Sequence, residues 1–374
     1  MMPSAYPMEA VLRHATSQSW LWLVVVAWAV GSLGAPDASA AEVSHVRRLM
    51  GVEWIVTVHA ASTEEAAAAA DAALDRVAAI EQVLSDYDPT SEVSQLMATT
   101  IREPGLRVPV SDDLARTLRA SLALTELTDG AFDVTVGSLT TLWRQARKTG
   151  RMPNAEKLAA ARAGTGPGSV VLHAGDHDEA SPQRPRVSLN HPSTKLDFGG
   201  IGMGYAIDAA MHLLEERGIH AAMIDASGDI AVSGPPPGRE HWRIAVPPLM
   251  RQPASTVSAA ANEQQAVPTL ALVHAAVATS GDAYQAVVID GIRYSHIVDP
   301  RTGLGVVGPT AVTVIAPDAT SADALSTALS VLGPREGLPL AEELKGVAAR
   351  CSWVDGDALR VESSARWANF LEPR

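Results

Sequence analysis

The chain has 374 residues, of which 47% are hydrophobic, 19% are charged and 4% are aromatic, and its formal net charge is −13. This composition is typical of a globular protein and excludes the disordered and fibrous classes. The single cysteine, Cys351, excludes an intramolecular disulfide and a cysteine-based zinc scaffold. Acidic residues outnumber basic ones by 42 to 29 and no basic stripe occurs, so we expect no nucleic-acid partner.

The first 40 residues have the three-part pattern of a secretory signal peptide. Arg13 precedes eleven uncharged residues, 20–30, and a small-residue segment follows that ends in Ala38-Ser39-Ala40, the expected cleavage site. Eleven residues are too few for a membrane-spanning helix, which needs about 20. We therefore expect residues 1–40 to direct export of a mature chain, residues 41–374. An uncleaved anchor is the alternative.

Hydrophobic periodicity and turn residues predict the elements of the mature chain. A strand is expected over residues 52–59, because they are rich in β-branched side chains. Ser62 and Glu65 form a capping box that opens a long helix. A second helix is expected over residues 111–128, with a stop at Gly130. Further helices are expected over residues 204–217 and 321–332, and further strands over residues 221–224, 286–289 and 311–315.

Two stretches rich in glycine, proline or small polar residues are predicted to lie at the surface. Residues 163–186 are expected to form an exposed excursion with at most one short strand, and residues 247–268 a surface insertion. The predicted strands and helices are mixed but do not alternate regularly. This arrangement favours an α+β fold over a doubly wound sheet.

Two motifs could bind a phosphate and a metal ion. The glycines of residues 199–204 follow a strand-like segment with Asp197 and open a helix, where free N–H groups can bind an anion. Asp323 and Thr327 are four residues apart on a predicted helix, so their oxygens share one face and suit Mg²⁺. Each motif also has a purely structural interpretation, as a tight strand-to-helix turn and as residues of a helix start.

A third motif, residues 294–303, concentrates polar groups in one loop. His296 lies three residues before Asp299, in a segment that ends with the turn sequence Asp-Pro-Arg-Thr-Gly. A titratable histidine beside a carboxylate suits proton transfer, although a structural histidine is also compatible with the pattern.

Taken in chain order, seven segments resemble the FAD:protein FMN transferase family, also called the ApbE family. The resemblance runs from Met50 to Gly333, over almost the whole mature chain. The segments are residues 50–51, 84–94, 130–143, 196–201, 278–282, 296–303 and 322–328.

The resemblance implies a single α+β domain over residues 41–374, with its active site in a central cleft, that binds FAD as substrate and Mg²⁺. Such enzymes transfer the FMN half of FAD to a Ser or Thr hydroxyl of an acceptor protein and release AMP. It also implies a periplasmic location and an acceptor in an exported or membrane redox system.

Matched residue by residue, the resemblance implies a set of FAD contacts and a set of Mg²⁺ ligands. The FAD contacts would be Met50, Tyr87, Ala131, Phe132, Asp133, Asp197, Met203, His296 and Ile297. The Mg²⁺ ligands would be the carbonyl of Gly200 and the side chains of Asp323 and Thr327. Met203 stands where the family usually has a lysine and sometimes a glutamate.

Transfer requires a base for the proton of the incoming hydroxyl. His296 is our first candidate, because an unperturbed histidine pKa near 6.5 suits proton transfer at neutral pH. Asp299 is the second candidate and could instead orient the histidine. Two other functions use the same pocket: Mg²⁺-dependent hydrolysis of FAD to FMN and AMP, and FAD binding without catalysis, for which Met203 is the main argument.

Overall fold

The computed structural model describes residues 40–173, 177–178, 181–182, 184–246, 268–281, 285–308, 310–356 and 358–373. Residues 1–39 of the predicted signal peptide and residues 247–267 of the predicted insertion lie outside this part of the chain. The segment from Ala40 to Arg374 forms one compact unit. In the described residues, no helix combines the length and apolar character that crossing a membrane requires.

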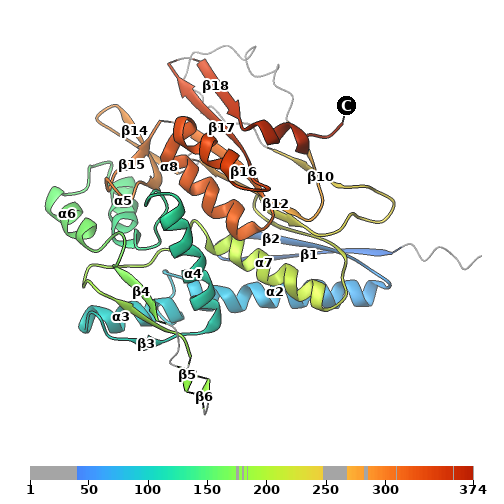
Figure 1. The fold of residues 1–374 in the computed structure, drawn as a ribbon, viewed down its shortest axis with the longest axis horizontal. Coiled ribbons are helices and arrows are strands. Elements are labelled where there is room, and N and C mark those ends of the chain that lie inside the picture. The colour runs from blue at the N-terminus through green and yellow to red at the C-terminus, as the bar shows by residue number, and fades with distance from the viewer. Residues whose placement is uncertain are drawn as a thin grey trace, which may run out of the picture. The chain divides into compact units, whose positions relative to one another are not determined.

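An antiparallel eight-stranded sheet organises this unit (Figure 1). Its strands, from one edge to the other, are β1 (Ala41–Leu49), β2 (Val52–Ala60), β8 (Ala221–Ala226), β9 (Asp229–Val232), β12 (Ala275–Gly281), β16 (Thr310–Ala316), β17 (Ala348–Asp355) and β18 (Ala358–Ser363). Three helices pack against one face: α2 (Thr63–Leu84), α7 (Gly202–Glu216) and α8 (Ala319–Glu343). The architecture is therefore α+β, as the sequence predicted.

The main hydrophobic core lies between this sheet and the three helices. Trp54 and Val56 of β2 are fully buried against it, and the buried face of α2 carries a run of alanines. Small side chains let α2 approach α7 closely, so the large apolar residues of both helices reach the sheet. A second core covers the other face, where β10 (Trp242–Ala245), β11 (Thr269–Leu272) and the 3₁₀ helix η2 (Ala365–Phe370) pack.

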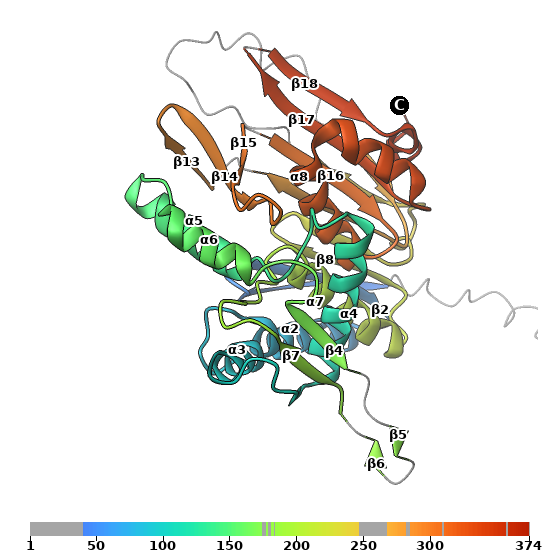
Figure 2. The ribbon, with the colours of Figure 1, turned by 60° about the vertical axis from the view of Figure 1, so that its left-hand side comes forward.

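The remaining elements lie outside the eight-stranded sheet and its three helices, and Figure 2 shows α5 and α6 side by side and β5 and β6 at the foot of the view. They are α3 (Glu92–Arg102), α4 (Asp112–Leu127), α5 (Gly137–Thr149), α6 (Ala155–Ala163), the sheet of β3 (Val108–Pro109), β7 (Arg186–Leu189) and β4 (Val170–His173), the pair β5 (His177–Asp178) and β6 (Ser181–Pro182), and the sheet of β13 (Ala286–Ile289), β14 (Ile292–Val298) and β15 (Gly305–Val307). A third core joins α5 to β13 and β14 through Leu139 and Trp143.

The predicted helix starts are confirmed. The Ser62 hydroxyl accepts a hydrogen bond from the Glu65 N–H (3.2 Å), and Ser111 caps α4 in the same way. The predicted strands at residues 52–59, 221–224, 286–289 and 311–315 all form. The predicted helix at residues 321–332 is the first part of α8, which turns at Gly333 because that residue has φ +70°.

Two sequence-based expectations were wrong. The segment with Asp197 is not a strand, because only an isolated bridge between Lys195 and Val136 forms there. Residues 163–186 hold more than one short strand: β4 pairs with β7 along four residues and buries Val170, and β5 and β6 follow. A strand needs pairing partners. The Asp197 segment has only the one bridge, whereas β4 has a partner in β7, and local propensity predicts neither outcome.

Candidate functional site

A cavity of about 820 Å³ opens among the β1–β2 turn, the end of α2, α5, the glycine turn before α7, β14 and α8. Pockets of this size hold drug-sized and larger ligands. Most of the predicted site residues line it: Met50, Tyr87, Ala131, Phe132, Asp133, Asp197, Gly200, Met203, His296, Ile297, Asp323 and Thr327. The fold thus brings together residues that are as much as 277 positions apart in the sequence.

Met50 lies in the tight turn between β1 and β2, with a left-handed φ of +49°. Few residues other than glycine adopt this conformation without support. Support comes from α2, because the Glu81 carboxylate accepts a hydrogen bond from the Met50 N–H at 2.8 Å. The turn is therefore held in place by the helix whose end lies at the same cavity.

Ala131, Phe132 and Asp133 follow α4 in a buried turn. The Phe132 N–H donates to the Thr128 hydroxyl, and the Asp133 carboxylate accepts from the N–H and the hydroxyl of Thr135 at 2.7 and 2.6 Å. Burial raises the pKa of Asp133 above its usual value, against the opposing effect of the Thr135 hydrogen bonds. The turn is rigid, so it presents a fixed wall.

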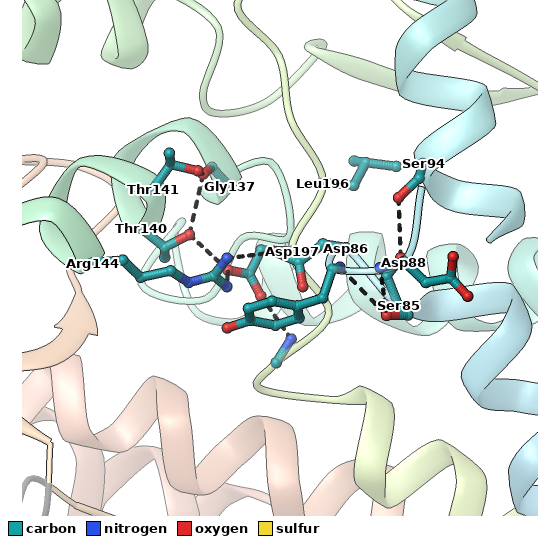
Figure 3. A network of polar contacts seen from close by, with 12 residues as sticks. Ser85, Asp86, Asp88, Ser94, Gly137, Thr140, Thr141, Arg144, Leu196 and Asp197 are labelled. Atoms are coloured by element: carbon teal, nitrogen blue, oxygen red, sulfur yellow. Dashed lines mark hydrogen bonds and ion pairs between the residues drawn. The ribbon is translucent and has the colours of Figure 1, made fainter. Parts of the chain in front are cut away.

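An ion-pair network forms the α5 wall (Figure 3). Arg144 donates to Asp86 at 2.7 Å and to Asp197 at 2.9 Å, and Thr140 donates to the same oxygen of Asp197 at 2.6 Å. Burial and the nearby Asp197 raise the pKa of Asp86, and Arg144 opposes them. Among the described lining residues the arginines are Arg144 and Arg147, both on α5, and there is no lysine. The positive charge of the lining is thus concentrated on one wall.

The glycine turn brings α7 against α8. A Cβ atom on Gly204 would lie 2.2 Å from the carbonyl oxygen of Ala319, and one on Gly200 would lie 2.9 Å from the Thr327 hydroxyl. Both contacts are too short: the one at Gly204 would require a shift of the α8 backbone, and the one at Gly200 a shift of the Thr327 side chain. The Gly204 N–H donates to the Asp323 carboxylate at 3.0 Å. The predicted anion site at the helix start therefore already has an internal partner for one N–H group.

Asp323 and Thr327 occupy one face of α8, as the sequence predicted. Asp323 is 3% exposed, and the Thr327 hydroxyl lies 3.1 Å from the Ser280 hydroxyl of β12. Burial and the charge of Asp229 raise the pKa of Asp323 well above its usual value. We call Gly200, Asp229, Asp323 and Thr327 the α8 corner.

Asp229, on β9, is a cavity residue that sequence reasoning missed. It is 8% exposed and accepts a hydrogen bond from the Thr279 N–H at 3.3 Å. Burial raises its pKa, with Asp225 adding to the effect. In the described part of the chain, neither Asp229 nor Asp323 forms an ion pair with a basic side chain. Two buried carboxylates without a cation call for a proton or a metal ion.

The oxygen donors of the α8 corner fit Mg²⁺. It prefers oxygen ligands, uses one or two protein carboxylates and keeps several waters or phosphate oxygens. The described residues contain no group of three or more His, Cys, Asp or Glu side chains arranged for a metal ion. A zinc-type site is therefore not supported there, whereas a sparse oxygen site is compatible with the corner.

His296 and Ile297 lie on β14 at the cavity, and the His296 N–H donates to the Gln285 carbonyl at 2.9 Å. Asp299 differs from the expectation, because it does not line the cavity. Its carboxylate accepts from the backbone and the guanidinium of Arg301 at 2.9 and 3.0 Å within the predicted turn. This ion pair stabilises the loop, and the position of Asp299 outside the lining favours His296 over it as the base.

Comparison with known proteins identifies the family. The sequence profile of the ApbE family matches residues 50–351, which is most of the chain. The chain belongs to the ApbE family. Among ApbE proteins, "FAD:protein FMN transferase" of Escherichia coli K12 is 27% identical over 87% of this chain and 88% of its own. The protein of the same name from Treponema pallidum is 30% identical over 92% of both chains.

Solved ApbE structures share this fold. The apo flavinyl transferase ApbE of Pseudomonas stutzeri superposes with a TM-score of 0.72 and 29% identity, over 88% of this chain and 97% of its own. The flavin transferase ApbE of Vibrio cholerae gives 0.71 and 26% identity, over 89% of this chain and all of its own. Each superposition therefore covers most of this chain and nearly all of the other.

Proposed function

We propose that this ApbE protein is an FAD:protein FMN transferase that moves FMN from FAD to a Ser or Thr hydroxyl of an acceptor protein. The observation that carries the proposal is that residues from all the family-like segments line one cavity. The relatives that match along most of their length bear this name, which supports the same activity here.

The reaction exchanges one P–O bond for another. The acceptor hydroxyl oxygen forms a bond to the phosphorus of the FMN half, and the bond from that phosphorus to the bridging oxygen of the diphosphate breaks. AMP leaves with the bridging oxygen, and the hydroxyl proton passes to a base. The acceptor is thereby flavinylated through a phosphoester.

The α8 corner would hold Mg²⁺ through the Gly200 carbonyl, the Asp323 carboxylate and the Thr327 hydroxyl, and Asp229 adds a second carboxylate nearby. A bound Mg²⁺ would neutralise charge on the diphosphate. The chain's own part is to keep Asp323 in place through the Gly204 N–H and to keep Thr327 in place through Ser280. These contacts fix both side chains before substrate arrives.

His296 is the proposed base. It lies on β14 at the cavity, and its backbone N–H donates to the Gln285 carbonyl. The strand therefore fixes the backbone from which the imidazole extends. Met50, Tyr87, residues 131–133, Asp197, Met203 and Ile297 would bind FAD along the rest of the cavity. Export to the periplasm and an acceptor in an exported or membrane redox system complete the proposal.

Incubation of the purified protein with FAD, Mg²⁺ and the membrane and periplasmic fractions of the source cell tests the proposal. We expect a protein band with flavin fluorescence that survives denaturation, and a mass gain of one FMN less one water. His296→Gln should lower the rate by roughly 10²–10⁴-fold with FAD still bound. Free FMN and AMP without a labelled protein would indicate hydrolysis instead, and bound FAD without turnover would indicate a binding protein.

A further inference from the structure

Arg144 lies beside an exposed aromatic ring at the cavity. Its guanidinium carbon is 4.6 Å from the centroid of the Tyr87 ring, which is a cation–π distance. Tyr87 is 77% exposed, although it lines the cavity. A large ring that is mostly open to solvent at a binding cavity needs a reason, because its burial would otherwise be favourable.

The guanidinium is held in one orientation. One of its terminal nitrogens donates to Asp86 and the other to Asp197, so the two carboxylates fix the plane of the group (Figure 3). The fork of an arginine can satisfy two carboxylates and still offer a flat face, which a lysine cannot do. The Tyr87 ring packs against this fixed cation.

The helix beneath Arg144 is also anchored. The preceding residue, Trp143, is 1% exposed, and its indole N–H donates to the Gly303 carbonyl at 2.9 Å. Gly303 closes the turn that follows the strand of His296. The backbone of α5 at Arg144 is therefore anchored by a buried contact to the loop beside the proposed base.

We propose that Arg144 is a positioning residue that holds the Tyr87 ring as a stacking platform for a planar heteroaromatic ring of the substrate. The proposal rests on the proposed function, because FAD supplies two such rings, the isoalloxazine and the adenine. Arg144 also offsets one of the two negative charges of Asp86 and Asp197, which reduces their repulsion of the anionic diphosphate. Arg144 thus has two roles, holding the Tyr87 ring and reducing the repulsion of the diphosphate, and experiment can separate them.

The test is a double-mutant cycle on binding, measured with FAD, FMN and AMP as separate probes on the full chain. Tyr87→Ala should weaken FAD binding by roughly ten- to a hundredfold, the usual range for loss of one stacking partner. Arg144→Met should weaken it by about tenfold in the wild-type background and by clearly less in the Tyr87→Ala background. Tyr87→Phe, which keeps the ring, should restore most of the affinity.

Binding of FMN and AMP, measured separately, shows whether the isoalloxazine or the adenine stacks on Tyr87. If it takes the isoalloxazine, Tyr87→Ala weakens FMN binding and removes the quenching of flavin fluorescence, and AMP binding is unchanged. If it takes the adenine, only AMP and FAD respond. Arg119→Met on α4, an exposed arginine away from the cavity, is the matched control and should bind all three probes normally.

Arg144→Lys covers the case in which Arg144→Met does not fold, and it should bind FAD with intermediate affinity. An equal loss from Arg144→Met with and without the Tyr87 ring would overturn the proposal, because Arg144 would then act through charge alone. Normal binding of FAD, FMN and AMP to Tyr87→Ala would also overturn it. A third outcome separates the two proposals. If the effects of Tyr87 and Arg144 on FAD binding depend on each other but no FMN is transferred to protein, the proposed function is refuted and the stacking platform is supported.

Discussion

Two walls of the same cavity carry buried or half-buried carboxylates, which have different partners. On the α5 wall, Asp86 and Asp197 share the guanidinium of Arg144 at 2.7 and 2.9 Å. In the α8 corner, Asp229 and Asp323 have no ion pair with a basic side chain of the described residues. Burial raises the pKa of both carboxyls, and the charge of Asp229 raises that of Asp323 further. The carboxylates of the α5 wall thus share a basic partner from the chain itself, whereas those of the α8 corner need a proton or a cation from solution.

The largest effect is expected from Asp323→Asn. The change keeps the shape of the side chain but removes a proposed metal ligand, so transfer should fall about a hundredfold or more. Stability without metal should not fall, because a buried and unpaired carboxylate is replaced by a neutral group. Transfer rates and thermal unfolding with and without Mg²⁺ check both statements. Unchanged transfer with full Mg²⁺ stimulation would contradict the assignment.

Gly204→Ala should destabilise the corner itself. The added methyl would lie 2.2 Å from the Ala319 carbonyl, so α8 must move, at a cost of about 1–3 kcal/mol in the free energy of unfolding. Gly202→Ala is the matched control on the same helix, because its methyl would meet only side-chain atoms at 3.5 Å or more. Denaturant unfolding of both variants measures the difference. Equal stability of the two would show that the helices are not in close contact at Gly204.

Asp229→Asn should have a smaller effect than Asp323→Asn. Loss of the second carboxylate should weaken Mg²⁺ binding by roughly tenfold, the range found for groups that support a metal site. Calorimetric titration with Mg²⁺ measures this directly. Asp225→Asn should have a smaller effect still, because Asp225 does not line the cavity and affects Asp229 only through its charge, while its carboxylate accepts from the Gly228 N–H.

Asp113 is a carboxylate away from the cavity that has hydrogen-bond partners. Its contribution to stability should change with pH in the opposite direction to that of a buried carboxylate without such partners. Burial alone would raise the pKa of Asp113, but hydrogen bonds from Arg76 (2.6 and 2.8 Å) and Tyr205 (2.7 Å) lower it below its usual value. A lowered folded pKa stabilises the protein above about pH 4, and this contribution is lost as pH falls through the folded value.

Asp113→Asn should therefore cost about 1 kcal/mol at neutral pH. The difference from wild type should shrink as the pH falls below the ordinary aspartate range, since the wild-type carboxylate is then protonated too. Urea unfolding across pH 3–7 measures it. A difference that stays constant with pH would show that the charge of Asp113 is not what stabilises the contact.

The sequence predicted local features well and distant pairings poorly. The caps at Ser62 and Ser111, the turn after His296 and the shared face of Asp323 and Thr327 depend on neighbouring residues, and all are present. Arg144 and Asp229 were missed because their partners are far away in sequence: Asp86 is 58 residues before Arg144. An arginine following the buried Trp143 on a helix carries no local sign of such a pair.

Asp299 was selected for its place beside His296 in the sequence, but adjacency along a strand end does not decide which way a side chain points. The following Arg301 pairs with it and turns it into the loop. The family resemblance gave the cavity residues as a set, whereas the electrostatic division between the α5 wall and the α8 corner follows from tertiary contacts alone.

Titration with Mg²⁺ in the presence of FAD tests the central claim most directly, with wild type, Asp323→Asn and Arg144→Met compared in one series. The account predicts that wild type binds the ion, that Asp323→Asn loses it, and that Arg144→Met keeps it once FAD is saturating, because the cation requirement lies in the α8 corner. Mg²⁺ binding that survives Asp323→Asn unchanged, or that depends on Arg144 instead, would contradict it.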